Sequence, residues 1–331
     1  MDQFRGKVVQ APMAGTSTPA LTAAVAGAGG FGFLAFGALD ADGAARAMAD
    51  LRGMWGGAFG VNLFCHGTAA PDAEGDAAWI TQLAPEFARF DAAPPAALRN
   101  IYPSFCAGDD VLRVILAAPP AVVSCHFGLP RPDQITALRG AGCLLWATAT
   151  HRAEAEAIRA AGFHAIVAQG WQAGGHRGMF DPSAPDPRLN TLDLLAELAP
   201  VGLPLIAAGG IMTRADARGA LDAGAVAVQC GTAFLRAPES ATSPAHRAAL
   251  GQDTVMTRAI SGRPARGVAN ALTRLGDGRA AAYPRAYDAG KALNAAAIAA
   301  GNTDYGAFWS GTGGAQAVAR PAADTVAAIT P

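Results

Sequence analysis

The chain has 331 residues, of which 51% are hydrophobic and 15% are charged, and its formal net charge is -1. This composition excludes a disordered chain, and the length suits one α/β barrel with additions or two domains. The two lysines and the scattered arginines form no basic stripe, so we expect no nucleic-acid partner. No apolar run approaches the length of a membrane span, and residues 1–7 lack the apolar core of a signal peptide. We therefore expect a cytoplasmic protein without a membrane partner.

The cysteines and histidines set further limits. The cysteines include no Cys-x-x-Cys pair, and three of them lie in or beside apolar runs, which favours buried free thiols in a reducing compartment over disulfides. No two histidines have the helical spacing of metal ligands, so we predict no metal. The five cysteines are Cys65, Cys106, Cys125, Cys143 and Cys230.

Eight short apolar segments have the length and composition of buried parallel strands. Several of them follow a helix end that is marked by Ala-Gly, and a long helical stretch is expected over residues 76–116. Eight strands with interposed helices predict an α/β fold, specifically a TIM (β/α)₈ barrel. The predicted strands lie within residues 7–11, 28–34, 59–64, 121–128, 144–148, 165–168, 203–211 and 226–232.

The pattern changes near Pro238, after which we expect helices without strands. We therefore assign residues 1–237 to the barrel and residues 238–331 to a helical extension that covers the barrel mouth and contributes to the substrate cavity. Residues 171–190, which are rich in Pro, Asp and Gly, form a predicted lid after the sixth strand.

The stretch from Gln169 to Gly178 follows the sixth strand, where barrels of this kind keep their active sites. Gly174 and Gly175 let backbone amides approach a ligand without a Cβ in the way. His176 supplies a group that can take or share a proton near neutral pH. A glycine-rich surface turn that carries a solvated histidine is the alternative. Apart from His176 and His126, the histidines are expected to have core or solvated roles; they are His66, His151, His164 and His246.

Two glycine-containing turns end the seventh and eighth strands, Gly209-Gly210 and Gly231-Thr232. Consecutive strand ends of this kind bind a phosphate on bare amides and a helix N-terminus, so the cofactor or substrate should carry a phosphate. A sugar-phosphate substrate would fit these two turns equally well. Schiff-base chemistry is disfavoured, because Lys7 is at the chain start and Lys291 is in the extension.

Other side chains at the strand ends suit a flat ring. The amides of Asn62 and Gln169 can donate to and accept from a heterocycle edge, or instead satisfy loop backbone. Pro12-Met13 offers a rigid apolar surface for one ring face, or simply packs. A ring together with a phosphate describes flavin mononucleotide (FMN).

Five motifs resemble those of the nitronate monooxygenases, formerly called 2-nitropropane dioxygenases, and the match runs through nearly the whole chain. The Ala-Gly-Gly-His-Arg-Gly block is the most specific, and the chain departs from the family pattern at Cys125 and Gln172. The motifs are Gln10-Ala11-Pro12-Met13-Ala14, Gly60-Val61-Asn62-Leu63-Phe64, Ser124-Cys125-His126-Phe127-Gly128, Ala173-Gly174-Gly175-His176-Arg177-Gly178 and Cys230-Gly231-Thr232-Ala233-Phe234-Leu235.

The resemblance implies a non-covalent FMN and the oxidation of an alkyl nitronate, such as propionate 3-nitronate, by dioxygen to a carbonyl compound and nitrite. It implies that His176 is the active-site base or the electrostatic partner of the nitronate, and that His126 lines the substrate pocket. Arg177 or an arginine of the extension would hold a substrate carboxylate. The residues implied to contact FMN are Ala11, Pro12, Met13, Asn62, Gln169, Gly174, Gly209, Gly210, Gln229, Cys230, Gly231 and Thr232.

Two alternatives remain open from the sequence. The first is an FMN-dependent NAD(P)H reductase with the same barrel, acting on an enoyl thioester or a quinone. The second is a non-catalytic barrel that binds a phosphate ligand. The oligomeric state is not predicted.

Overall fold

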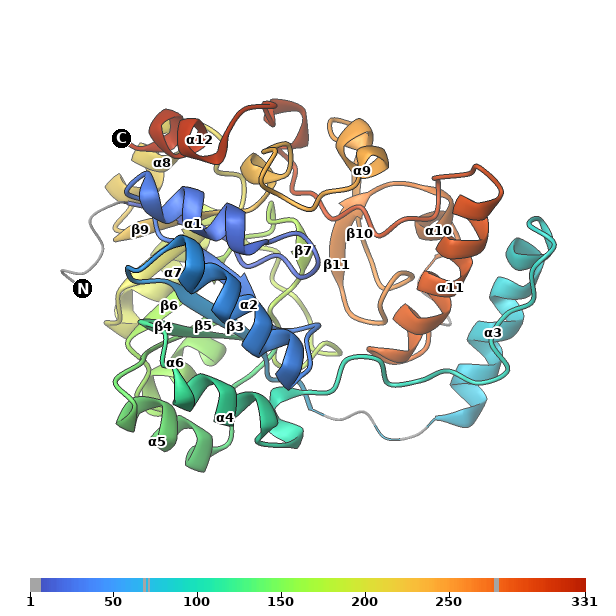
Figure 1. Cartoon of the computed structure of the whole chain (residues 1–331), viewed down its shortest axis with the longest axis horizontal. Coiled ribbons are helices and arrows are strands. Elements are labelled where there is room, and N and C mark those ends of the chain that lie inside the picture. Colours follow the sequence, from blue (N-terminus) through green and yellow to red (C-terminus); the bar gives the residue numbers. More distant parts are fainter. Residues whose placement is uncertain (1–6, 68–69, 71, 277–279) are drawn as a thin grey trace.

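The structure, a computed structural model, describes residues 7–67, 70, 72–276 and 280–331. Eight parallel strands form one sheet in the order β1-β9-β8-β6-β5-β4-β3-β2. A parallel bridge between Val9 and Phe31 joins its two ends, so the sheet is a nearly closed TIM-type barrel (Figure 1) and the predicted fold is confirmed. The strands are β1 (Val8–Gln10), β2 (Phe33–Ala35), β3 (Gly60–Phe64), β4 (Val122–His126), β5 (Leu144–Ala149), β6 (Ala165–Gln169), β8 (Leu205–Ala208) and β9 (Ala227–Cys230).

The strands are apolar on both faces because each face meets a different core. One face points into the barrel, where the Trp146 ring packs 6.0 Å from Phe31 and 5.6 Å from Phe33 between ring centroids. The neighbouring residues along the strands, such as Leu34 and Leu145, point outward to the helices. The alternation of these two sets fixes the register of the barrel.

Helices cover the outside of the barrel, and the last of them comes from the end of the chain. Helix α12 packs against α1 and α8, so the extension returns to the barrel. Helix α1 begins as predicted, with Thr18 accepting a hydrogen bond from the amide of Leu21 and proline in the first turn. These helices are α1 (Pro19–Gly27), α2 (Ala41–Met54), α4 (Asp110–Ala117), α5 (Pro132–Gly140), α6 (Arg152–Ala160), α7 (Thr191–Leu198), α8 (Arg214–Asp222) and α12 (Ala322–Ile329).

The long helical stretch expected over residues 76–116 is wrong. Helix α3 (Ala73–Ala88) ends well before Leu116, and the chain then runs without regular structure to the short helix η1 (Phe105–Ala107) and to α4. Helix α3 packs on α11 (Arg285–Ala299), away from the barrel (Figure 1), and Trp79, Leu83 and Leu293 share one core. A segment of residues 1–237 thus packs with the extension, and the division into two domains stays a prediction.

The extension contains strands, which corrects the expectation of helices alone. Strands β10 (Thr254–Thr257) and β11 (Ala265–Val268) pair antiparallel, and β11 also pairs with β7 (Gly175–His176). The β-branched residues of Thr254-Val255-Met256-Thr257 favour a strand, and β11 follows β10 closely in the sequence, but β7 lies far earlier in the chain. The pairing ties the predicted lid to the extension. The remaining helices of the extension are α9 (Pro244–Ala249) and α10 (Ala271–Arg274).

No helix within the described residues is long and apolar enough to cross a membrane.

Candidate active site

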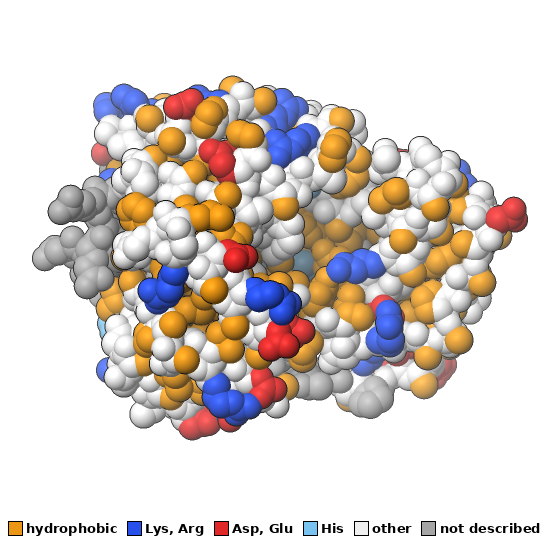
Figure 2. Space-filling view, in the orientation of Figure 1, with side chains coloured by type: hydrophobic (Ala, Val, Ile, Leu, Met, Phe, Trp, Pro, Cys, Tyr) orange, Lys and Arg blue, Asp and Glu red, His pale blue; other side chains and the backbone are white. Residues whose placement is uncertain are grey.

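A cavity of about 350 Å³ lies at the carboxyl ends of the barrel strands, between the barrel and the extension. Figure 2 shows the surface hollowed there, with histidine visible inside the hollow. The volume is within the range of ligand pockets. All the predicted cofactor residues line it, as do His126 and His176; the lining from the extension includes His246, Tyr283, Tyr287, Lys291 and Trp309.

The two predicted phosphate turns lie side by side in the cavity lining, because Ala208 of β8 is in register with Gln229 of β9. Gly209 and Gly210 have φ values of 115° and 73°, and a Cβ on Gly209 would lie 2.9 Å from the amide nitrogen of Ala173. Only glycine adopts these conformations here without strain. Within the described residues, the amides of Gly209, Gly210 and Gly231 donate no hydrogen bond, so they remain available to an anion.

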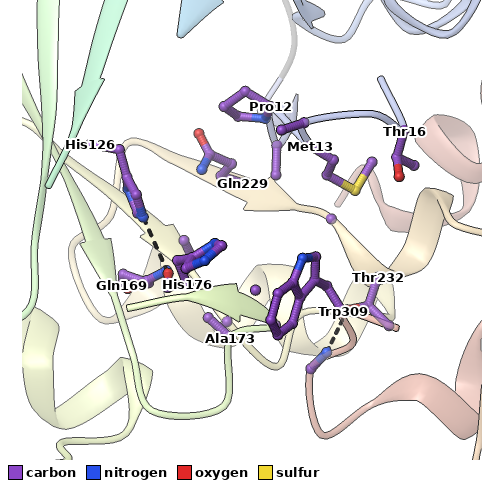
Figure 3. A pocket seen from close by; sticks show the side chains of 18 of the residues that line it. Pro12, Met13, Thr16, His126, Gln169, Ala173, His176, Gln229, Thr232 and Trp309 are labelled. Carbon is purple, nitrogen blue, oxygen red and sulfur yellow. Dashed lines mark hydrogen bonds between the residues drawn. The ribbon is translucent and has the colours of Figure 1, made fainter. Parts of the chain in front are cut away.

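The middle of the cavity has two facing walls. Pro12, Met13 and Gln229 lie on one side, and the rings of His176 and Trp309 lie on the other (Figure 3). The Trp309 indole donates to the hydroxyl of Tyr287 at 3.0 Å, which fixes its plane. Such an arrangement accepts a flat ring between apolar and aromatic surfaces.

Asn62 keeps one polar atom for a ligand. Its Oδ1 accepts a hydrogen bond from the Ser124 hydroxyl at 2.7 Å, so the amide nitrogen is the group left to donate into the cavity.

Gln169, by contrast, uses its amide on the loop backbone, which is the alternative that the sequence left open. Its Nε2 donates to the carbonyl oxygen of His176 at 2.8 Å, and its Oε1 accepts from the amide of Gly178 at 2.8 Å. Gln169 lines the cavity but positions the residues on either side of Arg177.

His126 also supports the loop. Its Nε2 donates to the carbonyl oxygen of His176 at 3.2 Å, and its Nδ1 accepts from the Thr148 hydroxyl at 3.0 Å. Burial, with a contribution from the charge on Arg263, lowers the pKa of His126 to about 4. His126 is therefore neutral near pH 7, and both of its nitrogens are engaged.

His176 projects into the cavity from β7, which the extension holds through the register Ala265↔His176. Its Nε2 lies 2.9 Å from the Ser261 hydroxyl, and its ring centroid is 5.0 Å from that of Trp309. Burial first, and then the nearby His126 and Arg263, lower the pKa of His176 to about 3. Among the described residues no hydrogen bond reaches Nδ1, which is the ring nitrogen left for a ligand.

Arg177 has a different role from the one expected of it. Its side chain is 1% exposed and is not part of the cavity lining. It forms a bidentate pair with Asp186 at 2.8 and 3.0 Å and donates to the carbonyl of Gln169 at 2.7 Å. Successive side chains of an extended segment point to opposite sides, so Arg177 faces inward when His176 faces the cavity. Its guanidinium is not available to a substrate carboxylate.

Among the described residues, the cation that lines the cavity is Lys291, which the sequence pattern does not mark as a site residue. Its Nζ lies 4.8 Å from the ring centroid of Tyr102 and 5.7 Å from that of Tyr287. Tyr287 and Lys291 are four residues apart on α11, which places them on one helix face. This i, i+4 spacing could have identified Tyr287 and Lys291 as neighbours on one helix face. Nothing in the sequence indicates that this face covers the barrel.

His246 and Arg263 were likewise missed. His246, expected to have a core or solvated role, is buried at the cavity wall and its ring bonds the carbonyl oxygen of Trp309 at 3.0 Å. Arg263 is 4% exposed, and its guanidinium lies 4.3 Å from the Phe127 ring centroid. It has no ion pair within the part of the chain that the structure describes. A buried positive charge therefore lies behind His176.

No group of histidine, cysteine, aspartate or glutamate residues in the described ranges has the geometry to hold a metal ion.

Comparisons with known proteins agree with this geometry. The family model described as "Nitronate monooxygenase" matches residues 3–331. The chain is 50% identical over 331 residues to a nitronate monooxygenase of Paraburkholderia phytofirmans, covering 97% of this chain and 90% of that protein. It is 45% identical over 326 residues to a nitronate monooxygenase of Pseudomonas aeruginosa, covering 96% and 93%.

Solved structures give the same picture. The nitroalkane oxidase from Streptomyces ansochromogenes superposes with a TM-score of 0.91 at 40% identity, covering 99% of this chain and 95% of that one. FabK from Thermotoga maritima superposes with a TM-score of 0.73 at 24% identity, covering 99% and 93%, which shows a shared fold alone.

Proposed function

The chain belongs to the nitronate monooxygenase family, and from this premise we propose that it binds FMN and oxidises alkyl nitronates by dioxygen to a carbonyl compound and nitrite. The enzyme class follows from identities of 50% and 45% over nearly the whole chain. The cofactor, the substrate and the residue roles are inferred from the cavity. The observation that carries the inference is the pair of glycine turns, whose amides donate to no acceptor within the described residues, beside a half-buried histidine.

The residues present fit FMN. The amides of Gly209, Gly210 and Gly231 would hold the phosphate, since no Cβ covers them and no described residue accepts from them. The amide nitrogen of Asn62 would donate to the ring edge, and Met13 would lie against one ring face. Bound FMN would supply the electron exchange between the nitronate and dioxygen.

His176 would act as a hydrogen-bond donor to the nitronate. At 2.9 Å, the Ser261 hydroxyl is closer to Nε2 than to its other acceptor, the carbonyl of Arg263 at 3.2 Å, which favours donation to the imidazole. The proton of the neutral ring is then on Nδ1, the nitrogen left for a ligand. A ring whose pKa is about 3 is a weak base, so it suits an already anionic substrate better than proton abstraction from a nitroalkane.

The backbone of the loop is what keeps that donor in place. Gln169 and His126 both donate to the carbonyl oxygen of His176, and β11 holds the same residue from the other side. Fixing the donor before the substrate arrives reduces the reorganisation that the reaction requires.

We further propose that the substrate is a small acid, such as propionate 3-nitronate. Lys291 would hold its carboxylate, because it lines the cavity and Arg177 is committed to Asp186. Lys291→Met should then lower kcat/KM for propionate 3-nitronate by roughly 10-fold or more, the scale of a charge-assisted hydrogen bond. The same variant should leave ethyl nitronate, which has no carboxylate, nearly unaffected.

The test of the function uses the purified full chain. An oxidised-flavin absorption spectrum, release of FMN on denaturation, and oxygen consumption with nitrite formation from a preformed nitronate are expected. NADPH oxidation that exceeds nitronate turnover would instead identify a reductase, and colourless protein that takes up no FMN would identify a non-catalytic barrel.

A further inference from the structure

Three of the five cysteines gather beside the active site. Cys65 directly follows β3, Cys125 is in β4, and Cys106 is in η1. The Ser104 hydroxyl, two residues before Cys106, donates to the carbonyl oxygen of Phe64, next to Cys65, at 3.4 Å. The thiols of Cys106 and Cys125 are close enough to Cys65 to raise the pKa of its thiol. All three are free, and within the described residues they do not form a metal site. Of the two remaining cysteines, Cys143 is buried elsewhere in the barrel, and Cys230, also buried, belongs to the lining of the cavity itself.

The three thiols differ in access. Cys65 and Cys125 are buried in the core between strands and helices, whereas Cys106 is half-buried. A small peroxide can therefore reach Cys106 without opening the barrel, and Cys65 lies behind it as the next sulfur.

Their chemistry differs as well. The pKa of Cys106 is lowered to about 6. The largest cause is the nearby Cys65 thiol, followed by the Ser104 hydroxyl and the charge of Arg131, while burial acts in the opposite direction. The Cys106 thiol also donates to the carbonyl oxygen of Leu129 at 3.5 Å, a contact that favours the protonated form. Burial raises the pKa of Cys65. Near pH 7 the outer sulfur is mostly a thiolate and the inner one a thiol, which is the arrangement of a nucleophile and a resolving cysteine.

We propose that Cys106 and Cys65 form a peroxide-sensitive dithiol, a modification site distinct from the nitronate cavity. The Cys106 thiolate attacks hydrogen peroxide: an S–O bond forms, the O–O bond breaks, and the leaving hydroxide takes up a proton to become water. The Cys65 sulfur then attacks the sulfenic acid: the S–S bond forms, the S–O bond breaks, and the Cys65 proton leaves with the hydroxyl as a second water. Two thiols are oxidised by two electrons and one peroxide is reduced.

The disulfide would change the cavity by moving the two chain segments that carry its sulfurs. Cys65 follows Phe64, whose ring lines the cavity at 6.4 Å from the His176 ring centroid. Cys106 is four residues after Tyr102, which lines the cavity next to Lys291. Drawing these two segments together displaces both, so nitronate turnover should fall when the bond forms.

The test uses the reduced full-length protein as purified, titrated with hydrogen peroxide, blocked with iodoacetamide and digested without reduction for mass spectrometry. One Cys65–Cys106 disulfide per chain is expected. Turnover should fall several-fold and return with dithiothreitol. Cys106→Ser should retain wild-type turnover before oxidation and keep it afterwards, whereas Cys143→Ser should respond as the wild type does.

A second measurement does not depend on any variant. At pH 7, iodoacetamide should alkylate Cys106 about 10²-fold faster than Cys143, because burial raises the pKa of Cys143 to about 11. The thiolate fractions differ by about 10⁴, and the weaker nucleophilicity of a low-pKa thiolate removes roughly 10² of this. Equal alkylation rates, a disulfide between other cysteines, sulfinic acid at Cys106 without a disulfide, or equal peroxide inactivation of Cys106→Ser would each overturn the proposal.

Discussion

Replacing Asp186 with asparagine tests whether Arg177 is a structural residue of the loop. In the native chain, two charge-assisted hydrogen bonds of 2.8 and 3.0 Å join Asp186 to a guanidinium that is 1% exposed. The asparagine side chain would keep one neutral acceptor, but the positive charge would stay buried without its counterion. Breaking a buried pair in this way costs about 3–5 kcal/mol. Asp186 is 13% exposed and Arg177 also bonds two carbonyls, so we expect about 3 kcal/mol.

Urea unfolding of the two proteins measures this loss. At an m-value of about 3 kcal/mol/M, the midpoint should fall by about 1 M with the slope unchanged. The matched control is Glu156→Gln, which breaks the exposed Arg152–Glu156 pair, half-exposed on both sides, and should change stability by less than about 0.5 kcal/mol.

The kinetics of Asp186→Asn separate the two roles of Arg177. A structural residue acts on the position of His176, so kcat/KM should fall by one common factor for ethyl nitronate and propionate 3-nitronate. A selective change for the carboxylated substrate, or a midpoint equal to that of the Glu156→Gln control, would refute the structural assignment.

Three further predictions concern the cavity. The lowered pKa values of His176, His126 and His246, about 3, 4 and 4, mean that the unfolded chain binds more protons than the folded chain below pH 6.5. The free energy of unfolding should therefore fall as the pH drops from about 6.5 to 4, by about 1.4 kcal/mol per pH unit for each histidine. A flat profile would contradict the neutral state of these histidines in the folded protein. Gly210→Asp should weaken FMN retention strongly in a folded protein, because it adds a carboxylate and a strained Cβ at φ 73°. An unchanged flavin content in the folded variant would exclude this turn as the phosphate site. His176→Asn should slow the turnover of preformed nitronates as well as of neutral nitroalkanes, and wild-type nitronate rates in a variant that holds FMN would exclude the donor role.

The barrel could be predicted because its signals are local. Apolar segments such as residues 165–168 and Ala-Gly helix ends report strands and helix stops without knowledge of their partners. The turn at Gly209-Gly210 carries its own conformational reason, because both residues have a positive φ. The strand ends of a parallel barrel meet at one edge, so residues such as Asn62 could be assigned to one site from sequence alone.

The rest depends on contacts between distant segments. The pattern of α3 identifies a helix but not its partner α11, some 200 residues later in the chain. Strand β7 has only two residues and exists because β11 pairs with it. Gln169 and Arg177 were assigned to ligands because their residue types suit that role. The side to which Arg177 points depends on the β7–β11 pairing, which the sequence does not reveal.

Arg263 offers a final prediction, because its charge is buried without an ion pair in the described residues. The Phe127 ring centroid lies 4.3 Å from its guanidinium and 5.5 Å from the His176 ring centroid. The charge is therefore within about 10 Å of His176, where a unit charge contributes at least about 1.7 kcal/mol at an effective dielectric of 20. This field disfavours protonation of His176 and favours an anion bound to it.

Arg263→Met should accordingly lower kcat/KM for ethyl nitronate about 10-fold or more and change that for neutral nitroethane much less. The pKa of His176, measured by an NMR pH titration of its imidazole in the folded protein, should rise by about one unit. Arg263→Lys keeps the charge and should restore most of both properties, which separates the electrostatic effect from packing against Phe127. If Arg263→Met and Arg263→Lys lose activity equally, or if the anionic and neutral substrates lose it by the same factor, the side chain acts through packing and its charge has no role in catalysis.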